Sequence, residues 1–238
     1  MKFKIFRFKK VKSTNNTAIR IIRNTNYNHG MIISKIQSNG RGQYGKKWIS
    51  YNGNLFVSFF YKLDNLTVSF NQLTKINCLL VKRLLSLYYK KKIIFKKPND
   101  LLINKKKIAG ILIDSISKGN KICELYVGIG INAKIAPPNL NYETTCLKDV
   151  STITISRMKV LSKLIFYFNY WEKVFQNKSF IYIANCWMER SLPINSRISF
   201  KDNNKIINGI YKGISETGSI RILINNKECN FFNLETIV

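Results

Sequence analysis

A glycine-rich segment between residues 38 and 48 contains the first side chains that could perform chemistry. Its three glycines begin at Gly40 in a G-x-G-x-x-G pattern, and Arg41, Lys46 and Lys47 lie among or just after them. A dinucleotide-binding fingerprint would precede a helix and a Walker loop would contain Gly-Lys-Ser/Thr, whereas a strand pattern follows here. The segment therefore predicts a flexible loop that folds over a phosphate or carboxylate. On these residues alone, a basic surface hairpin without a ligand is equally open.

A lysine at the start of an apolar strand is the second feature. Lys107 precedes Ile-Ala-Gly-Ile-Leu, in which Ala109 and Gly110 are small enough to let a ligand or another backbone approach. A cation at the mouth of such a slot can neutralise a carboxylate or phosphate group. Asn99 and Asp100 lie across the predicted hairpin, where the carboxylate would be near an amine or a metal ion. Because Lys107 follows two other lysines, an ordinary solvated position is the alternative.

Two glycines near the end of another strand pattern form the third feature. Gly128 and Gly130 leave the backbone accessible, because neither carries a side chain. Asn132 follows at the end of the strand, where its carboxamide can bind ribose or phosphate.

These three features must be positioned by a mixture of strands and helices. Alternating or β-branched segments predict strands over 2–9, 31–37, 55–62, 93–95, 101–103, 108–116 and 122–131, the last four as a meander of antiparallel hairpins. Helical spacing of apolar residues predicts helices over 13–23, 71–92, 156–177 and 180–190, the first of them capped near Ser13. After Leu192-Pro193 the pattern changes to short strands with turns at 202–204, 216–218 and 225–226. We therefore expect an α+β domain over residues 1–190 and a small β-barrel over residues 191–238.

The charge is strongly basic. The chain has 40 Lys and Arg against 12 Asp and Glu, a formal net charge of +28, and 45% hydrophobic residues that can bury a substantial core. Lysine outnumbers arginine 31 to 9, and the excess accompanies frequent Asn and Ile throughout the chain. Such a uniform bias favours a solvated basic surface with weak, non-specific binding of polyanions, whereas a clustered patch would favour a nucleic-acid-binding module.

The cysteines and the single histidine argue against several classes of functional site. Five cysteines without a C-x-x-C pair indicate reduced thiols in the cytoplasm. A single histidine, His29, argues against histidine-based metal cages and catalytic triads. Lysine and arginine interrupt the apolar residues of the N-terminus, and no run of 18 apolar residues occurs, so we expect neither a secretory signal nor a membrane span.

Five motifs occur together in the order and spacing found in biotin protein ligases. They are Ser-Thr-Asn from Ser13, Gly-Arg-Gly-x-x-Gly-x-x-Trp from Gly40 to Trp48, Lys-x-Pro-Asn-Asp from Lys96 to Asp100, Lys-x-Ala-Gly-Ile-Leu from Lys107 to Leu112, and Gly-x-Gly-Ile-Asn from Gly128 to Asn132. The sequence resembles this family over nearly its full length. Because the first motif starts at residue 13, the resemblance is to the form without an N-terminal DNA-binding domain, and we expect no specific DNA binding.

The resemblance implies a fold and a reaction. The fold is a central mixed sheet flanked by helices, of the class II synthetase-like biotin/lipoate ligase type, followed by an SH3-like β-barrel. In the reaction, biotin and MgATP give biotinyl-5′-AMP and pyrophosphate. The biotinyl group then passes to a lysine of a biotin carboxyl carrier protein domain, as in acetyl-CoA carboxylase. Formation of a homodimer is left open.

The resemblance also assigns roles to individual residues. Arg41, Lys107 and Asp100 are the expected catalytic residues. The expected biotin site comprises Ser13, Thr14, Asn15, Gln37, Gly40, Arg41, Lys107, Gly110, Gly128 and Gly130, with the last three shaping the slot through their missing side chains. The expected nucleotide site comprises Arg41, Gln43, Lys46, Trp48, Asn99, Asp100, Lys107 and Asn132. No protein ligand for a metal is expected, and Mg2+ would be held through the ATP phosphates.

Three positions depart from the family pattern. Gln43 and Lys46 stand where arginine is frequent, and Lys97 stands where tryptophan is usual. Lysine or glutamine cannot reproduce the bidentate phosphate contact of a guanidinium. We therefore expect looser retention of the adenylate and its measurable release into solution.

Lipoate and octanoate protein ligases are the nearest alternatives, because they share the scaffold and a catalytic lysine. Their arginine-glycine loop with a trailing His-Asp is absent here, since His29 precedes the loop and is not followed by Asp. A basic nucleic-acid-binding module explains the charge but leaves the five ordered motifs unexplained.

Overall fold

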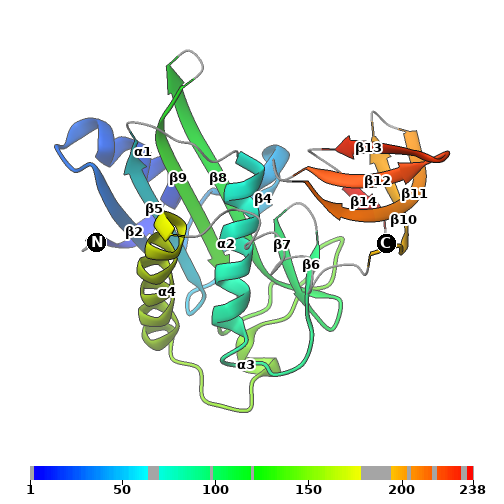
Figure 1. The fold of residues 1–238 in the computed structure, drawn as a ribbon. Coiled ribbons are helices and arrows are strands. Elements are labelled where there is room, and N and C mark those ends of the chain that lie inside the picture. Colours follow the sequence, from blue (N-terminus) through cyan, green and yellow to red (C-terminus); the bar gives the residue numbers. More distant parts are fainter. Residues whose placement is uncertain are drawn as a thin grey trace.

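A seven-stranded mixed sheet forms the centre of the molecule (Figure 1). The computed structural model describes residues 3–63, 70–96, 99–118, 121–177, 194–202, 205–215, 219–231 and 235–237. The sheet has the order β1-β2-β5-β9-β8-β7-β6, with strands β1 (Lys4–Val11), β2 (His29–Gln37), β5 (Leu55–Lys62), β6 (Ile93–Lys96), β7 (Asp100–Ile103), β8 (Lys106–Lys118) and β9 (Lys121–Ile131). Only β1 and β2 pair in parallel, because helix α1 (Thr14–Asn24) provides the crossover that such a pair requires.

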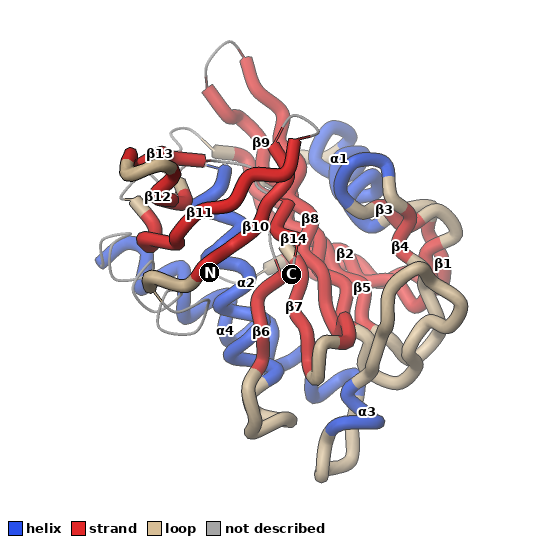
Figure 2. The backbone as a smooth tube through the Cα atoms, turned by 90° about the vertical axis from the view of Figure 1, so that its right-hand side faces the viewer, coloured by secondary structure: helices blue, strands red, loops and turns tan. Residues whose placement is uncertain are grey.

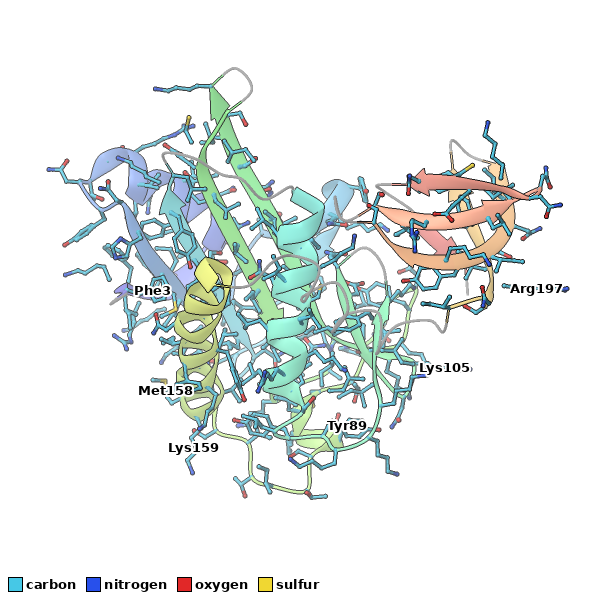
Figure 3. The ribbon with its side chains drawn as sticks, in the orientation of Figure 1. Phe3, Tyr89, Lys105, Met158, Lys159 and Arg197 are labelled. Carbon is cyan, nitrogen blue, oxygen red and sulfur yellow. The ribbon has the colours of Figure 1, made fainter. Side chains whose placement is uncertain are left out.

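Helices cover both faces of this sheet. Helix α1 lies on one face, and helices α2 (Phe70–Leu85) and α4 (Arg157–Asn177) lie on the other (Figure 2). Successive residues of β5 show how alternation serves both layers: Phe60 packs in the cluster beneath α1, whereas Phe59 stacks on Phe168 of α4 with ring centroids 3.7 Å apart. Phe3 also packs on this second face, beside α4 (Figure 3). The larger of the two apolar cores therefore lies between the sheet and the α2–α4 layer.

One expected helix is shorter than predicted, and another cannot be compared. Helix α2 ends at Leu85 instead of residue 92, since the N–H groups of Leu87 and Tyr88 turn back to carbonyls three residues earlier. Tyr88 and Tyr89 follow as buried side chains, and Tyr89 donates a hydrogen bond to Asn104. The helix expected over 180–190 lies outside the described residues. Among the described helices, none is long and apolar enough to cross a membrane.

The meander that carries the second and third motifs is confirmed. Strands β6, β7, β8 and β9 pair consecutively and antiparallel, with Asp100 opposite Gly110 and Gly110 opposite Gly130. A long connection then leads through the short helix α3 (Leu147–Val150) to α4. The register brings the predicted site residues of three strands into one row.

A separate five-stranded antiparallel sheet follows at the C-terminal end (Figure 1). It has the order β13-β12-β11-β10-β14, with strands β10 (Arg197–Asp202), β11 (Lys205–Ile214), β12 (Ile220–Ile224), β13 (Lys227–Phe231) and β14 (Glu235–Ile237). Phe200, Tyr211 and Ile222 are fully buried at its centre. Asn225 and Asn226 form the predicted tight turn with positive φ angles of 47° and 61°. This sheet matches the expected SH3-like unit, although the expected boundary at residue 190 and the turn over 216–218 lie outside the described residues.

Candidate active site

One cavity of about 650 Å³ gathers the motifs that the sequence separates. Its wall includes all of the predicted site residues except Gly40 and Asn132: Ser13, Thr14, Asn15, Gln37, Arg41, Gln43, Lys46, Trp48, Asn99, Asp100, Lys107, Gly110, Gly128 and Gly130. Arg41 and Lys107 in particular line the same cavity, although 66 positions separate them in the sequence. The hypothesis of a single anion-handling site requires this arrangement.

One end of the cavity is polar and lies where β1 and β2 end. Ser13 caps α1, with its side chain accepting a hydrogen bond from the N–H of Asn16. Gln37 Oε1 accepts hydrogen bonds from both the N–H of Thr14 at 2.8 Å and the hydroxyl of Thr14 at 3.0 Å. The parallel pairing of β1 and β2 places these residues side by side, so the first motif and the end of the second strand form one hydrogen-bonding surface.

Asn15 forms a buried wall beside this polar end. Its Oδ1 accepts a hydrogen bond from the Ser58 hydroxyl at 2.5 Å, and its Nδ2 donates one to Asp114 Oδ2 at 2.9 Å. A Cβ atom on Gly128 would lie only 2.5 Å from Asn15 Oδ1. The missing side chain of Gly128 therefore makes room for Asn15 at the cavity wall, and its expected role in shaping the biotin slot stays a prediction.

The floor of the cavity is formed by two glycines on neighbouring strands and by the indole of Trp48. A Cβ atom on Gly110 or on Gly130 would lie 2.7 Å or 2.5 Å, respectively, from atoms of that ring. The space that the two glycines leave is filled by Trp48, so they act on the cavity through the position of this ring, and their expected role in shaping the biotin slot stays a prediction. The indole Nε1 and Asp100 Oδ1 are buried without a hydrogen-bond partner among the described residues.

Lys107 lies at the opposite end in a sheltered environment. Its Nζ is 2.8 Å from Asp100 Oδ2 and lies 5.2 Å and 5.3 Å from the ring centroids of Trp48 and Tyr142. The backbone around it is fixed as well, because the N–H of Lys107 donates to Glu143 and its carbonyl accepts from Thr145. A cation held between two aromatic rings and a carboxylate can approach an anionic ligand with little reorganisation.

Sequence reasoning did not single out Tyr142. Burial, and after it the charge of Asp100, raises the pKa of Tyr142, so its phenol stays neutral at ordinary pH. It belongs to a polar segment after two prolines, and no spacing signal sets it apart. Only the folded connection between β9 and α3 brings it to Lys107.

Arg41 approaches the cavity from the glycine-rich segment. Its Nη1 donates to Asn16 Oδ1 at 2.7 Å and lies 3.2 Å from Asp114 Oδ2, and its Nη2 donates to Asp114 Oδ1 at 3.3 Å. Asp114, on β8, was also not anticipated from the sequence. The guanidinium is therefore held between α1 and β8.

The glycine-rich segment itself forms a closed hairpin instead of the expected flexible loop. Strands β3 (Gly40–Arg41) and β4 (Lys47–Trp48) pair across a single 3-10 turn, Gln43–Gly45, and the N–H of Gly42 donates to Lys46 at 2.7 Å. Gly40 supports the hairpin from behind, because a Cβ atom there would lie 2.5 Å from the carbonyl oxygen of Trp48. We refer to residues 38–48 as the lid.

Asn132 is the other predicted residue that the structure does not bring to the cavity wall. Its side chain is buried, and its Nδ2 donates to the carbonyl oxygens of Thr145 at 3.1 Å and Lys107 at 3.5 Å. It thus supports the backbone behind Lys107, and its expected contact with a nucleotide stays a prediction. Asn99, by contrast, does line the cavity and fixes its wall by donating to the carbonyl of Ile111.

The charge of the cavity favours an anionic ligand. Six lining residues are basic, namely Arg41, Lys46, Lys47, Lys96, Lys105 and Lys107, against the two acidic residues Asp100 and Glu143. Lys105, for instance, lies at the turn between β7 and β8 (Figure 3). Over the described residues, no group of three or more His, Cys, Asp or Glu side chains could hold a metal ion. Any metal at this cavity would depend mainly on ligands that the substrate supplies.

Comparison with known proteins identifies the family of this chain. Residues 7–132, more than half of the chain, match the family model described as the biotin/lipoate A/B protein ligase family, and the chain belongs to this family. Within it, the similarity is to biotin protein ligases. The structure of the biotin protein ligase from Aquifex aeolicus in complex with biotin and ATP is similar with a TM-score of 0.80 and 27% identity, covering 98% of this chain and 97% of that one.

Curated relatives show the same similarity in sequence. The biotin–[acetyl-CoA-carboxylase] ligase of Paracoccus denitrificans is 26% identical over 196 residues, which is 79% of this chain and 82% of the relative. The bifunctional ligase/repressor BirA of Salmonella typhimurium is 25% identical over 192 residues. In that case, the match covers 79% of this chain but only 60% of the relative.

Proposed function

We propose that this protein is an ATP-dependent biotin protein ligase of the cytoplasm that joins biotin to a lysine of a biotin carboxyl carrier domain. The observation that carries the proposal is the convergence of Arg41 on the lid, Lys107 on β8 and the Thr14–Gln37 pair on one cavity. The Aquifex aeolicus and Paracoccus denitrificans relatives support the choice of biotin over lipoate.

The polar end of the cavity suits the ureido ring of biotin. This ring presents a carbonyl acceptor and two N–H donors, and the hydroxyls of Ser13 and Thr14 and the carboxamide of Gln37 offer both kinds of partner. The apolar chain of biotin would then run along the Gly128 side of the cavity towards Trp48. Its carboxylate would reach the neighbourhood of Lys107.

Lys107 would assist the first half-reaction. A carboxylate oxygen of biotin attacks the α-phosphorus of ATP and pyrophosphate leaves, so two anions must meet before a bond forms. The ammonium of Lys107 can neutralise the carboxylate and the negative charge that builds on the phosphoryl oxygens. A Mg2+ ion held through the ATP phosphates would supply further neutralisation, with Asp100 as the nearby carboxylate that would orient it. The lid would exclude water from the mixed anhydride that results.

The second half-reaction requires an uncharged lysine amine from the carrier. The amine attacks the acyl carbon of biotinyl-5′-AMP, an amide bond forms, and AMP leaves. Asp100 lies next to the position expected for that carbon and can accept the proton that the amine loses. The same carboxylate would thus serve both steps.

Intact-mass measurement of an acetyl-CoA carboxylase carrier domain tests the proposal. After incubation with the protein, biotin and MgATP, one added biotinyl group on one lysine is expected. Reactions without ATP, and with lipoate or octanoate in place of biotin, serve as controls. Modification by lipoate but not by biotin would instead support the lipoate ligase alternative and overturn the choice of substrate. A sequence-specific nucleic-acid complex that survives physiological salt, with no modification of the carrier, would overturn the assignment as an enzyme.

A further inference from the structure

Asp114 lies on β8 outside the cavity wall but holds two residues that belong to it. Its Oδ1 and Oδ2 accept from Arg41 on the lid, and Oδ2 also accepts from Asn15 on α1. By strand alternation it lies on the same face of β8 as Gly110 and Leu112, both of which line the cavity. Its carboxylate is therefore placed to connect the lid with the fixed part of the site.

A continuous polar chain passes through this carboxylate. The hydroxyl of Ser58 donates to Asn15, Asn15 donates to Asp114, and Arg41 donates to Asp114 from the other side. Ser58 and Asn15 are buried, so their orientations are fixed by the sheet and by α1. The Arg41 end of the chain belongs to the lid hairpin. A rigid acceptor that faces a half-exposed guanidinium is suited to hold a lid and to release it.

At its start the lid is joined to the end of β1, where the N–H groups of Ser38 and Asn39 donate to the carbonyls of Val11 and Lys12. Beyond this point, two of its side chains attach it to the site in different ways. Trp48 rests on the glycine floor through ring contacts, and Arg41 is bound through charge and hydrogen bonds. The ion pair depends on Asp114, whereas the other Arg41 partner, Asn16, is an uncharged amide. Removing the charge of Asp114 would leave the ring contacts intact and weaken only one attachment.

We infer that Asp114 is a positioning residue that holds the lid closed through Arg41 and thereby sets how long a reaction intermediate stays in the cavity. The identity of that intermediate, biotinyl-5′-AMP, rests on the proposed function. The attachment of the lid does not rest on it. The two parts can therefore be tested separately.

Hydrogen exchange of the lid tests the attachment without any substrate. In Asp114→Asn the backbone amides of residues 38–48, Gly42 among them, should exchange about fivefold faster, as expected for the loss of a partly exposed ion pair. Added NaCl should accelerate this exchange in the unaltered protein but not in the variant, an effect that a merely structural carboxylate would not produce. Glu228→Gln removes a comparable ion pair with Arg221 in the C-terminal sheet and should leave exchange in the lid unchanged.

A second variant keeps the test informative if Asp114→Asn does not fold. Arg41→Gln removes the other half of the same pair and should accelerate lid exchange to a similar extent. The double variant should show no further acceleration of lid exchange, because the two side chains act through one contact. Unchanged lid exchange in folded Asp114→Asn and Arg41→Gln, or fully additive effects in the double variant, would overturn the inference.

The rate at which the adenylate is released tests whether the lid attachment retains the intermediate in the cavity. Protein loaded with biotin and MgATP should lose biotinyl-5′-AMP to solution about fivefold faster in Asp114→Asn, and Asp114→Glu should largely restore retention. If the unaltered protein forms no biotinyl-5′-AMP, the proposed function fails, while the exchange experiment still decides the role of Asp114. If the adenylate forms and its release is unaffected in a variant whose lid opens faster, the positioning role is overturned.

Discussion

Two ion pairs border the same cavity, and they differ in how they are held. Lys107 and Asp100 are 2.8 Å apart, with about a fifth or less of each side chain exposed, and the ammonium lies between the rings of Trp48 and Tyr142. Arg41 and Asp114 are 3.2 Å apart, and 41% of the Arg41 side chain is exposed. One pair is enclosed by rigid neighbours, whereas the other joins a hairpin to the sheet.

This difference indicates a division of roles. A sheltered pair keeps its geometry and acts strongly on charge that develops nearby, because water screens it little. A partly exposed pair contributes at most about 1 kcal/mol, which suits a contact that must break and re-form. Both pairs use β8, so a single strand connects the site of chemistry with the site of lid attachment. Four predictions, besides those for Asp114, test this contrast.

The largest effect is expected from removing the sheltered cation. Lys107→Met should reduce biotin-dependent pyrophosphate release by about 1,000-fold, because the ammonium held between Trp48, Tyr142 and Asp100 is the preorganised charge of the site. Lys106→Met is the matched control: the neighbouring lysine pairs with the exposed Glu143 and does not line the cavity, so its loss should have little effect. Near-normal pyrophosphate release by Lys107→Met would refute the role of Lys107.

A smaller effect is expected from filling the floor. Gly130→Ala places a Cβ atom about where the Trp48 indole now lies, so the ring must move away from Lys107. We expect kcat/KM for biotin to fall by about 10- to 100-fold through misplacement of the site. Ile131→Val, on the opposite face of the same strand and outside the cavity wall, should lower the free energy of unfolding by about 1 kcal/mol and leave kcat/KM nearly unchanged. Equal kinetics in the two variants would contradict the proposed role of the floor.

The lid can also be strengthened. Gln43→Arg adds a guanidinium to the cavity wall, and a bidentate phosphate contact should slow the release of biotinyl-5′-AMP by about fivefold. Gln43→Met controls for side-chain size and should not slow release. The release is measured by the biotinylation of a bystander protein that has no carrier domain. Faster bystander labelling by Gln43→Arg would contradict the prediction, because it would show that the missing arginine is not what limits retention of biotinyl-5′-AMP.

A buried cation away from the cavity should affect stability and not catalysis. Burial lowers the pKa of Lys75 on α2 to about 8, below the value of about 10.4 in an unfolded chain. Between these two values the unfolded chain binds more protons than the folded one, so the free energy of unfolding should rise by about 1 kcal/mol from pH 7 to pH 9. Urea denaturation of the unaltered protein and of Lys75→Met isolates this contribution, since the variant should lack it. An identical pH dependence in both would contradict the lowered pKa.

The sequence predicted the parts of the site that depend on local pattern. Arg41 and Lys107 were identified because glycine spacing and an apolar strand start are visible in the chain, and the meander followed from its turns. Tyr142 and Asp114 could not be identified in this way, because each becomes important only through a partner on a distant element. Gly110, Gly128 and Gly130 were recognised as site residues, and so were Trp48 and Asn15, but the sequence did not show that the indole and the carboxamide occupy the space beside these glycines.

The backbone contacts on either side of Lys107 have a consequence for sequence change. The segment at residues 143–145 fixes this lysine through main-chain N–H and carbonyl groups, and these groups are the same for nearly every amino acid. The side chains of residues 143–145 can therefore be exchanged widely without moving the backbone of Lys107, whereas the ring of the preceding Tyr142 faces the ammonium itself. A chain rich in lysine and asparagine can in this way keep the backbone of one lysine in a fixed place.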